Sequence, residues 1–283
     1  MPDIRRPVVV GVDGSPASLG AVRWAVDEAA RHSVPLKVVH ALGRPGLLGF
    51  SSKEQRIALD AAVEARRWVP GTEVTTTTAV GSPAGVLRDQ SHRAGLVVVG
   101  SRGHGGFSGL LVGSVSAHLA AYAHCPLLVV HRGENWAGQE AQLPSHAPIV
   151  VGDDGSAPAQ HALGLAFAEA AARRVPLVAV RVWQQPEQRR RRRPVDPVGL
   201  AAAEERALST GVEPWRIKYP DVEVRLVVRE GGVAAELIQA ATQALMVVLG
   251  ARGRGGFEEL LLGSVTHQVL HHAASPVLVD RVN

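Results

Sequence analysis

Two glycine-rich stretches contain the residues whose types and spacing could do chemistry. Residues 100–116 read GSRGHGGFSGLLVGSVS, residues 250–266 read GARGRGGFEELLLGSVT, and 11 of the 17 aligned positions are identical. Each stretch follows an apolar run and leads into an amphipathic segment, which predicts a strand, a glycine loop and a helix. Such a loop presents unhindered backbone N–H groups where the helix dipole favours negative charge. The sequence therefore predicts two phosphate-binding loops.

An aspartate follows the first predicted strand in each half. Asp13 lies in GVDGS and Asp154 lies in GDDGS. In an open parallel sheet, ligands bind at the carboxyl ends of the strands, so each aspartate is expected to share a crevice with the glycine loop of its half. Either aspartate could instead only cap the helix that follows, and the sequence leaves both roles open. Asp153, beside Asp154, is expected to be a solvated charge.

The elements that must position these residues alternate between strand and helix. In the first half we expect strands at residues 8–10, 35–42, 73–80, 96–100 and 126–131, and helices at 16–32, 53–69, 83–93 and 114–123. Strands separated by helices indicate a parallel sheet with right-handed crossovers and helices on both faces. The pattern restarts at residue 149, which predicts an α/β protein of two tandem open-sheet domains, each with a five-stranded parallel sheet.

The domain boundaries follow from the repeat. We expect one domain at residues 1–133, a polar linker at 134–147 and a second domain at 148–283. Landmarks are displaced by 141 residues early in the repeat (Asp13 to Asp154) and by 150 residues later (Gly100 to Gly250). The difference of nine residues places an insertion at the five arginines of 189–193, which we interpret as a solvated loop.

The length, charge and cysteine content limit the classes of protein to which this chain can belong. The chain has 283 residues, a formal net charge of +4 and 46% hydrophobic residues, which suits two globular domains and does not by itself indicate a nucleic-acid surface. Its single cysteine, Cys125, precludes an intrachain disulfide and is expected to be an inert core residue. Without a signal-peptide pattern or a membrane-length apolar run, the expectation is a soluble, cytoplasmic protein.

The spacing of the loop glycines resembles a known signature. Gly100-x-x-Gly103, nine residues and Gly113-Ser114 are similar to the nucleotide-binding motif of the universal stress proteins, and residues 250–264 repeat it. The opening VVVGVDGSPAS and the ending CPLLVV are also similar to that family. The resemblance covers nearly the whole chain, once per half, and is greatest to the tandem-domain members of actinobacteria.

This resemblance implies a Rossmann-like fold of the adenine nucleotide α-hydrolase type, one ATP per domain with or without Mg²⁺, and a role in stress or dormancy responses. It implies that the aspartate contacts the adenosine end, that Ala41 and Val182 line the base, and that the loop and helix start hold ribose and phosphates. Members usually dimerise through the last strand, so the two final strands are expected to pair within or between chains. The candidate nucleotide-binding residues are Gly11, Asp13, Ala41, Val99, Gly100, Arg102, Gly103, Gly113, Ser114, Val115 and Ser116 in the first half, and Gly152, Asp154, Val182, Leu249, Gly250, Arg252, Gly253, Gly263, Ser264, Val265 and Thr266 in the second.

The residues give less support to other nucleotide motifs, to catalysis or to metal binding. No Walker A motif and no G-x-G-x-x-G frame fits either loop, which argues against a P-loop NTPase and a dinucleotide site. No Ser-His-Asp constellation is apparent, so we expect a nucleotide-binding regulator without efficient catalysis. The alternatives are a slow ATP hydrolase or nucleotidyl-transfer enzyme and a nucleotide-free interaction module. His267 and His271 have a spacing that can ligate metal, but without a third ligand the sequence predicts no metal site.

Overall fold

The structure is a computed structural model that describes residues 6–43, 51–103, 112–131, 146–184, 197–254 and 261–281. Most of the predicted linker and the arginines of 189–193 lie outside the described residues. The chain divides into two compact units. The first unit comprises Pro2–Gln142 and Pro276–Asn283, and the second comprises Met1 and Leu143–Ser275.

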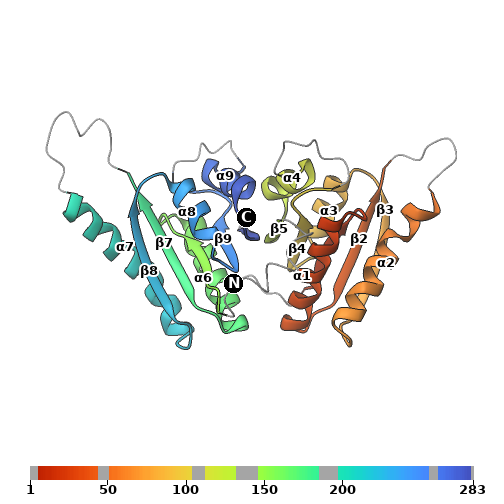
Figure 1. Cartoon of the computed structure of the whole chain (residues 1–283), viewed down its shortest axis with the longest axis horizontal. Helices are drawn as coiled ribbons and strands as arrows, with labels where there is room; N and C mark the ends of the chain where they lie inside the picture. The colour runs from red at the N-terminus through yellow and green to blue at the C-terminus, as the bar shows by residue number, and fades with distance from the viewer. Residues whose placement is uncertain are drawn as a thin grey trace. The chain divides into compact units, whose positions relative to one another are not determined.

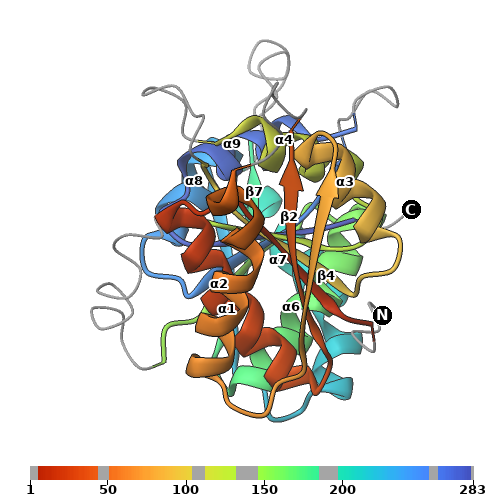
Figure 2. The same cartoon turned by 90° about the vertical axis from the view of Figure 1, so that its right-hand side faces the viewer.

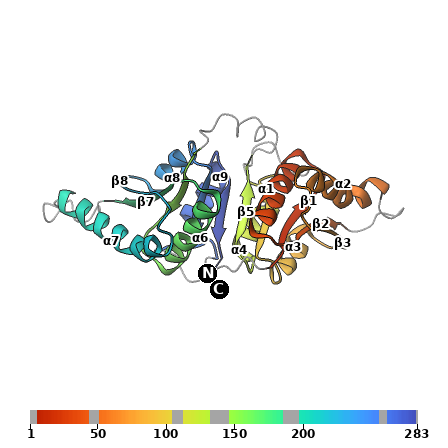
Figure 3. The same cartoon turned by 90° about the horizontal axis from the view of Figure 1, so that it is seen from below.

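The first unit contains a parallel sheet in the order β3-β2-β1-β4-β5 (Figure 1). The strands are β1 (Val8–Val12), β2 (Leu36–Leu42), β3 (Val74–Val80), β4 (Leu96–Gly100) and β5 (Leu127–Val130). The helices are α1 (Pro16–His32), α2 (Ser52–Trp68), α3 (Pro83–Ser91) and α4 (Ser114–Tyr122). Helices α1 and α2 cover one face of the sheet, and α3 and α4 cover the other (Figure 2, Figure 3).

Local sequence accounts for these elements. β1 and β4 are nearly continuous runs of buried valine, as expected of strands covered on both faces. Helix α1 begins at Pro16 after the N-cap Ser15, whose side chain accepts a hydrogen bond from the Ser18 N–H. Helix α2 begins with a capping box between Ser51 and Glu54. The predicted elements of this half therefore agree with the structure to within a few residues at their ends.

The second unit repeats this arrangement with a parallel sheet in the order β9-β6-β7-β8. Its strands are β6 (Ile149–Gly152), β7 (Leu177–Trp183), β8 (Val224–Glu230) and β9 (Met246–Gly250). Its helices are α6 (Ala157–Arg173), α7 (Pro197–Lys218), α8 (Val233–Ala241) and α9 (Ser264–His272). The α/β class and the tandem repeat predicted from the sequence are thereby confirmed.

The last strand of the chain is β10 (Val277–Asp280). It pairs antiparallel with β5, with Val277 opposite Val129 and Leu278 opposite Leu128, and it belongs to the first unit. Arg281, just beyond it, donates hydrogen bonds to the carbonyls of Ala120 and Ala123 at the end of α4. The sequence repeat still assigns β10 to the predicted domain of residues 148–283, but by strand pairing it completes the first unit. Of the two predicted ways for the final strands to pair, the structure shows the one within the chain.

Two expectations from composition can be compared with the described residues. Cys125 is buried, and burial raises the pKa of its thiol to about 12, so it is the inert core residue that was predicted. Across the described residues, no helix combines the length with the apolar composition that crossing a membrane requires.

Candidate functional site

A pocket of about 540 Å³ lies in the first unit where β1, β2 and β4 end and α4 begins. All eleven residues predicted for the first half line it, namely Gly11, Asp13, Ala41, Val99, Gly100, Arg102, Gly103, Gly113, Ser114, Val115 and Ser116. Six further lining residues were not predicted, namely Val12, Ser18, Val39, Pro83, Leu87 and Val112. Leu87 could be recognised in the sequence only as an inward position of an amphipathic helix, which does not distinguish a pocket wall from core.

Apolar side chains line one end of the pocket, and the start of a helix lines the other. Val39 and Ala41 on β2 and Leu87 on α3 provide apolar walls at one end. At the other end, Ser114 and Val115 belong to the first turn of α4. Because the strand order is β2-β1-β4, these two ends lie on opposite sides of β1. An apolar slot beside a polar helix start fits a ligand with a flat hydrophobic group at one end and an anion at the other.

The start of α4 lacks the side-chain cap found elsewhere in the unit. Its N-cap is Gly113, which makes no side-chain cap hydrogen bond, whereas α1, α2 and α3 are each capped by a serine. Helix α9 in the second unit begins in the same way, after Gly263. The first N–H groups of a helix need partners from outside it, and at these two helix starts no side chain in the described part of the chain caps them. Both helix starts are therefore suited to an anionic ligand.

The loop glycines differ in how closely other atoms approach them. The contacts that a Cβ atom would make at each position show this difference. At Gly100 it would lie 2.8 Å from the backbone of Ala17, and at Gly103 it would collide with the Asp13 carboxylate. At Gly113 the nearest atom, the Ser101 carbonyl oxygen, is 3.4 Å away, which is an ordinary contact. At Gly100 the neighbouring backbone therefore excludes a side chain, at Gly103 the Asp13 carboxylate would have to shift, and at Gly113 the protein has room for alanine.

Asp13 supports the turn into α1 and also lines the pocket. Its Oδ1 accepts hydrogen bonds from the Ser15 N–H at 3.0 Å and the Ser15 hydroxyl at 2.6 Å, which shapes the turn into α1. Its Oδ2 lies against Gly103, and the residue lines the pocket. The carboxylate therefore supports the helix start from a position in the pocket wall, and a contact with a ligand stays a prediction.

Of the four hydroxyl side chains predicted to hold phosphate, two form hydrogen bonds within the protein and two are exposed. Ser116 is buried and donates to the Gly100 carbonyl at 2.9 Å, and Thr266 donates to the Gly250 carbonyl at 2.8 Å. These bonds tie α4 to β4 and α9 to β9. Ser114 is exposed at the pocket and Ser264 is exposed at the start of α9, so these two serines offer the accessible hydroxyls.

The second unit places its candidate residues on the equivalent elements. Gly152 ends β6, Val182 lies in β7, Leu249 and Gly250 end β9, Arg252 and Gly253 follow β9, and Gly263, Ser264, Val265 and Thr266 form the start of α9. Asp154 accepts from the Ser156 N–H at 2.9 Å and the Arg254 N–H at 2.8 Å. Burial raises the pKa of Asp154, but these hydrogen bonds and the Arg254 charge outweigh it and keep the pKa below its ordinary value.

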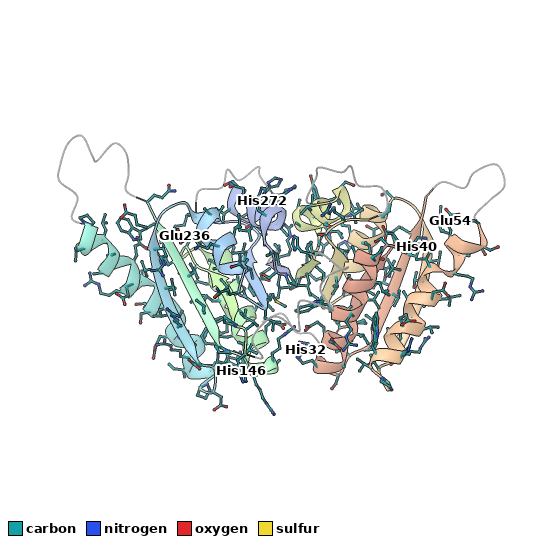
Figure 4. The ribbon with its side chains drawn as sticks, viewed as in Figure 1. His32, His40, Glu54, His146, Glu236 and His272 are labelled. Carbon is teal, nitrogen blue, oxygen red and sulfur yellow. The ribbon has the colours of Figure 1, made fainter. Side chains whose placement is uncertain are left out.

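One prediction in this unit is wrong. Asp153 is not a solvated charge, because it is 4% exposed and its carboxylate contacts Arg181 of β7 at 2.7 Å. Arg181 also contacts Glu204 of α7, and Gln160 donates to Asp153 at 3.2 Å. No sequence pattern indicated this cluster, because its members come from three separate elements and the loop after β6. In the first unit the corresponding strand position is His40, which lies on the same side of the sheet as α2 and its Glu54 (Figure 4).

Comparisons with known proteins agree with this architecture. The family model for the universal stress protein family matches residues 5–131 and again 146–281. Universal stress protein Rv2623 of Mycobacterium tuberculosis is 34% identical over 291 residues, covering 97% of this chain and 96% of that protein. Universal stress protein Rv2005c of the same organism is 36% identical over 296 residues, with the same coverage.

A solved structure shows the same fold over the full length. The crystal structure of a universal stress protein from Archaeoglobus fulgidus has a TM-score of 0.69 and 18% identity and covers 98% of both chains. With the family model matched twice and full-length relatives above 30% identity, the chain belongs to the universal stress protein family as a tandem of two such domains.

Proposed function

We propose that this protein binds an adenine nucleotide, with ATP as the preferred ligand, at the carboxyl edge of the sheet in each unit, and that it acts as a nucleotide-dependent regulator in a stress response. The observation that supports this most strongly is the pocket in which the uncapped start of α4 faces an apolar slot. The purine would lie against Val39 and Ala41, and the phosphates would accept hydrogen bonds from the N–H groups of α4.

The lining residues favour binding over catalysis. Among the described residues of the pocket, the charged side chains are those of Asp13 and Arg102. Phosphoryl transfer needs a positioned nucleophile, neutralised phosphates and a stabilised transition state. Asp13 already accepts two hydrogen bonds from Ser15, which fixes it as a structural turn residue. It would face a Mg²⁺ ion brought in with the triphosphate, and a slow ATP hydrolase remains the alternative.

Gly113 provides the sharpest test, because the protein without ligand tolerates a Cβ there. In the full chain, Gly113→Ala should leave the melting temperature without nucleotide unchanged and weaken ATP binding at the first site at least about tenfold, since the methyl group would occupy the space of a phosphate. Calorimetry should show two sites in the original protein and one in the variant. Gly263→Ala should remove the other site in the same way, by placing a methyl group where a phosphate would lie. The fold should tolerate it, because the added Cβ would meet only ordinary contacts, the nearest at 3.4 Å from the Arg252 backbone.

Gly43→Ala is the matched control. A Cβ at Gly43 has nothing within 4 Å, and the residue does not line the pocket, so both stability and ATP affinity should stay unchanged. Equal ATP affinity in Gly113→Ala and the original protein would refute the proposed site. Phosphate release near the typical enzyme rate of about 10 s⁻¹ would favour the hydrolase instead. A thermal shift with ATP but not with inorganic phosphate would argue against a nucleotide-free interaction module.

A further inference from the structure

Helix α9 of the second unit places two imidazole rings next to each other. His267 and His271 are four residues apart, so they lie one above the other on the same side of the helix. Their ring centroids are 4.5 Å apart and their planes are inclined by 36°. The ring of His272 is further away, with its centroid 6.3 Å from that of His271.

This spacing matches the geometry of two imidazoles bound to one metal ion. Metal–nitrogen bonds of about 2.1 Å that meet at about 90°, as in the square-planar or tetragonal sites of Ni²⁺ and Cu²⁺, bring two imidazole centroids to roughly 4.5 Å from each other, and the wider tetrahedral angle of Zn²⁺ separates them by roughly 5.3 Å. The rings of His267 and His271 are already at that separation. Side-chain rotation would then direct one nitrogen of each ring at a common ion.

The helix that bears these rings is firmly held and leaves them accessible. Thr266, Val269 and Leu270 are buried on its inner side, and the Thr266 hydroxyl bonds to the Gly250 carbonyl. His267 is exposed and His271 is half-buried, so an ion can reach both from solvent. Because the backbone is fixed by these contacts, chelation would lose only side-chain freedom, which favours binding.

The two proposed ligands are imidazole nitrogens, and this determines which metal ions the site would favour. Imidazole nitrogen suits Zn²⁺, Ni²⁺ and Cu²⁺, whereas Mg²⁺ and Ca²⁺ prefer oxygen ligands. We propose that His267 and His271 form a two-histidine site for a divalent transition-metal ion, with water completing the coordination. The sequence alone predicted no metal site because it offered no third protein ligand. The ring geometry identifies instead an open site that needs only two.

The first unit serves as an internal reference. With the displacement of 150 residues that relates Gly100 to Gly250, Ala117 and Ala121 of α4 correspond to His267 and His271. The same helix in the same fold thus lacks both rings in the first unit. The proposed site belongs to the second unit alone, and its two imidazole ligands are not among the residues proposed to bind the nucleotide.

The test is a titration of the full-length protein, free of any histidine tag, with Zn²⁺ or Ni²⁺ by isothermal titration calorimetry. His267→Ala and His271→Ala should each weaken binding by about tenfold or more, because one ligand cannot chelate. His118→Ala is the matched control, since His118 lies on α4 and its ring stacks on Tyr122. That variant should bind like the original protein, and an excess of Mg²⁺ should not compete.

Two outcomes would overturn the proposal. One is unchanged affinity in both His267→Ala and His271→Ala while their melting temperatures match that of the original protein. The other is a loss of binding in His32→Ala instead, which would locate the ion at α1, where His32 lies 3.7 Å from Glu28. Proton NMR gives a second readout, because added Zn²⁺ should shift the ring signals of His267 and His271 and leave that of His118 in place.

Discussion

The two units share their glycine loops but differ in what lies beside the first strand. In the first unit, the His40 ring donates a hydrogen bond from Nδ1 to the Val12 carbonyl at 2.7 Å. At the corresponding positions, 141 residues later, Arg181 contacts the buried carboxylate of Asp153 at 2.7 Å. The same pair of strands thus accommodates either one hydrogen bond or a buried ion pair. The comparison teaches that the uncapped helix starts after the glycine loops are repeated in both units, whereas the contact beside the first strand differs between them.

The largest predicted effect concerns the ion pair. Arg181→Leu leaves the Asp153 carboxylate buried without its cation, which should destabilise the second unit by about 3–5 kcal/mol. Hydrogen exchange measured by mass spectrometry should show faster exchange in β6 and β7 and little change in β1 and β2. His40→Leu in the first unit should cost far less, because it removes one hydrogen bond and no buried charge.

A double substitution sharpens this comparison. Asp153→Val combined with Arg181→His installs the residues of the first unit and removes both buried charges together. It should be more stable than Arg181→Leu alone, since replacing a whole buried pair is much less costly than breaking it. If Arg181→Leu costs less than about 1 kcal/mol, the ion pair does not stabilise the unit as the 2.7 Å contact implies.

A smaller effect should be equal in both units. A Cβ at Gly100 would lie 2.8 Å from the backbone of Ala17, and one at Gly250 would lie 2.9 Å from that of Pro158. Because backbone atoms cannot move aside easily, Gly100→Ala and Gly250→Ala should each cost about 1–3 kcal/mol, as measured by urea unfolding. Unequal costs would show that the strand-to-helix contact is less similar in the two units than its distances indicate.

The smallest effect is the pH dependence contributed by Asp154. Because its pKa in the folded protein lies below the ordinary value of 3.8, this carboxylate stabilises the fold above that value. The contribution is lost as the pH falls through the lower, folded-state pKa. Asp154→Asn should therefore reduce the acid sensitivity of the second unit below about pH 4, as followed by thermal unfolding at several pH values. A variant with the same acid sensitivity as the original protein would contradict this assignment.

Much of the fold and of the candidate site could be predicted from the sequence because the signals are local. Valine runs, serine caps and glycine loops each act within a few residues, so the strands, the helices and their order followed from them. The predicted residues of the first half meet in one pocket because carboxyl ends of parallel strands share an edge. Walls such as Leu87 were missed, since helical periodicity marks a residue as inward without saying what it faces.

The sequence by itself therefore determined a duplicated α/β chain with two glycine loops at helix starts. Only the tertiary structure decided that β10 pairs with β5, that Asp153 is buried against Arg181, and that Gly103 lies against the Asp13 carboxylate whereas Gly113 has room for a methyl group. The physical reason is the same in each case. These facts depend on which atoms from distant segments come into contact, and a contact between distant segments leaves no periodic pattern in the chain.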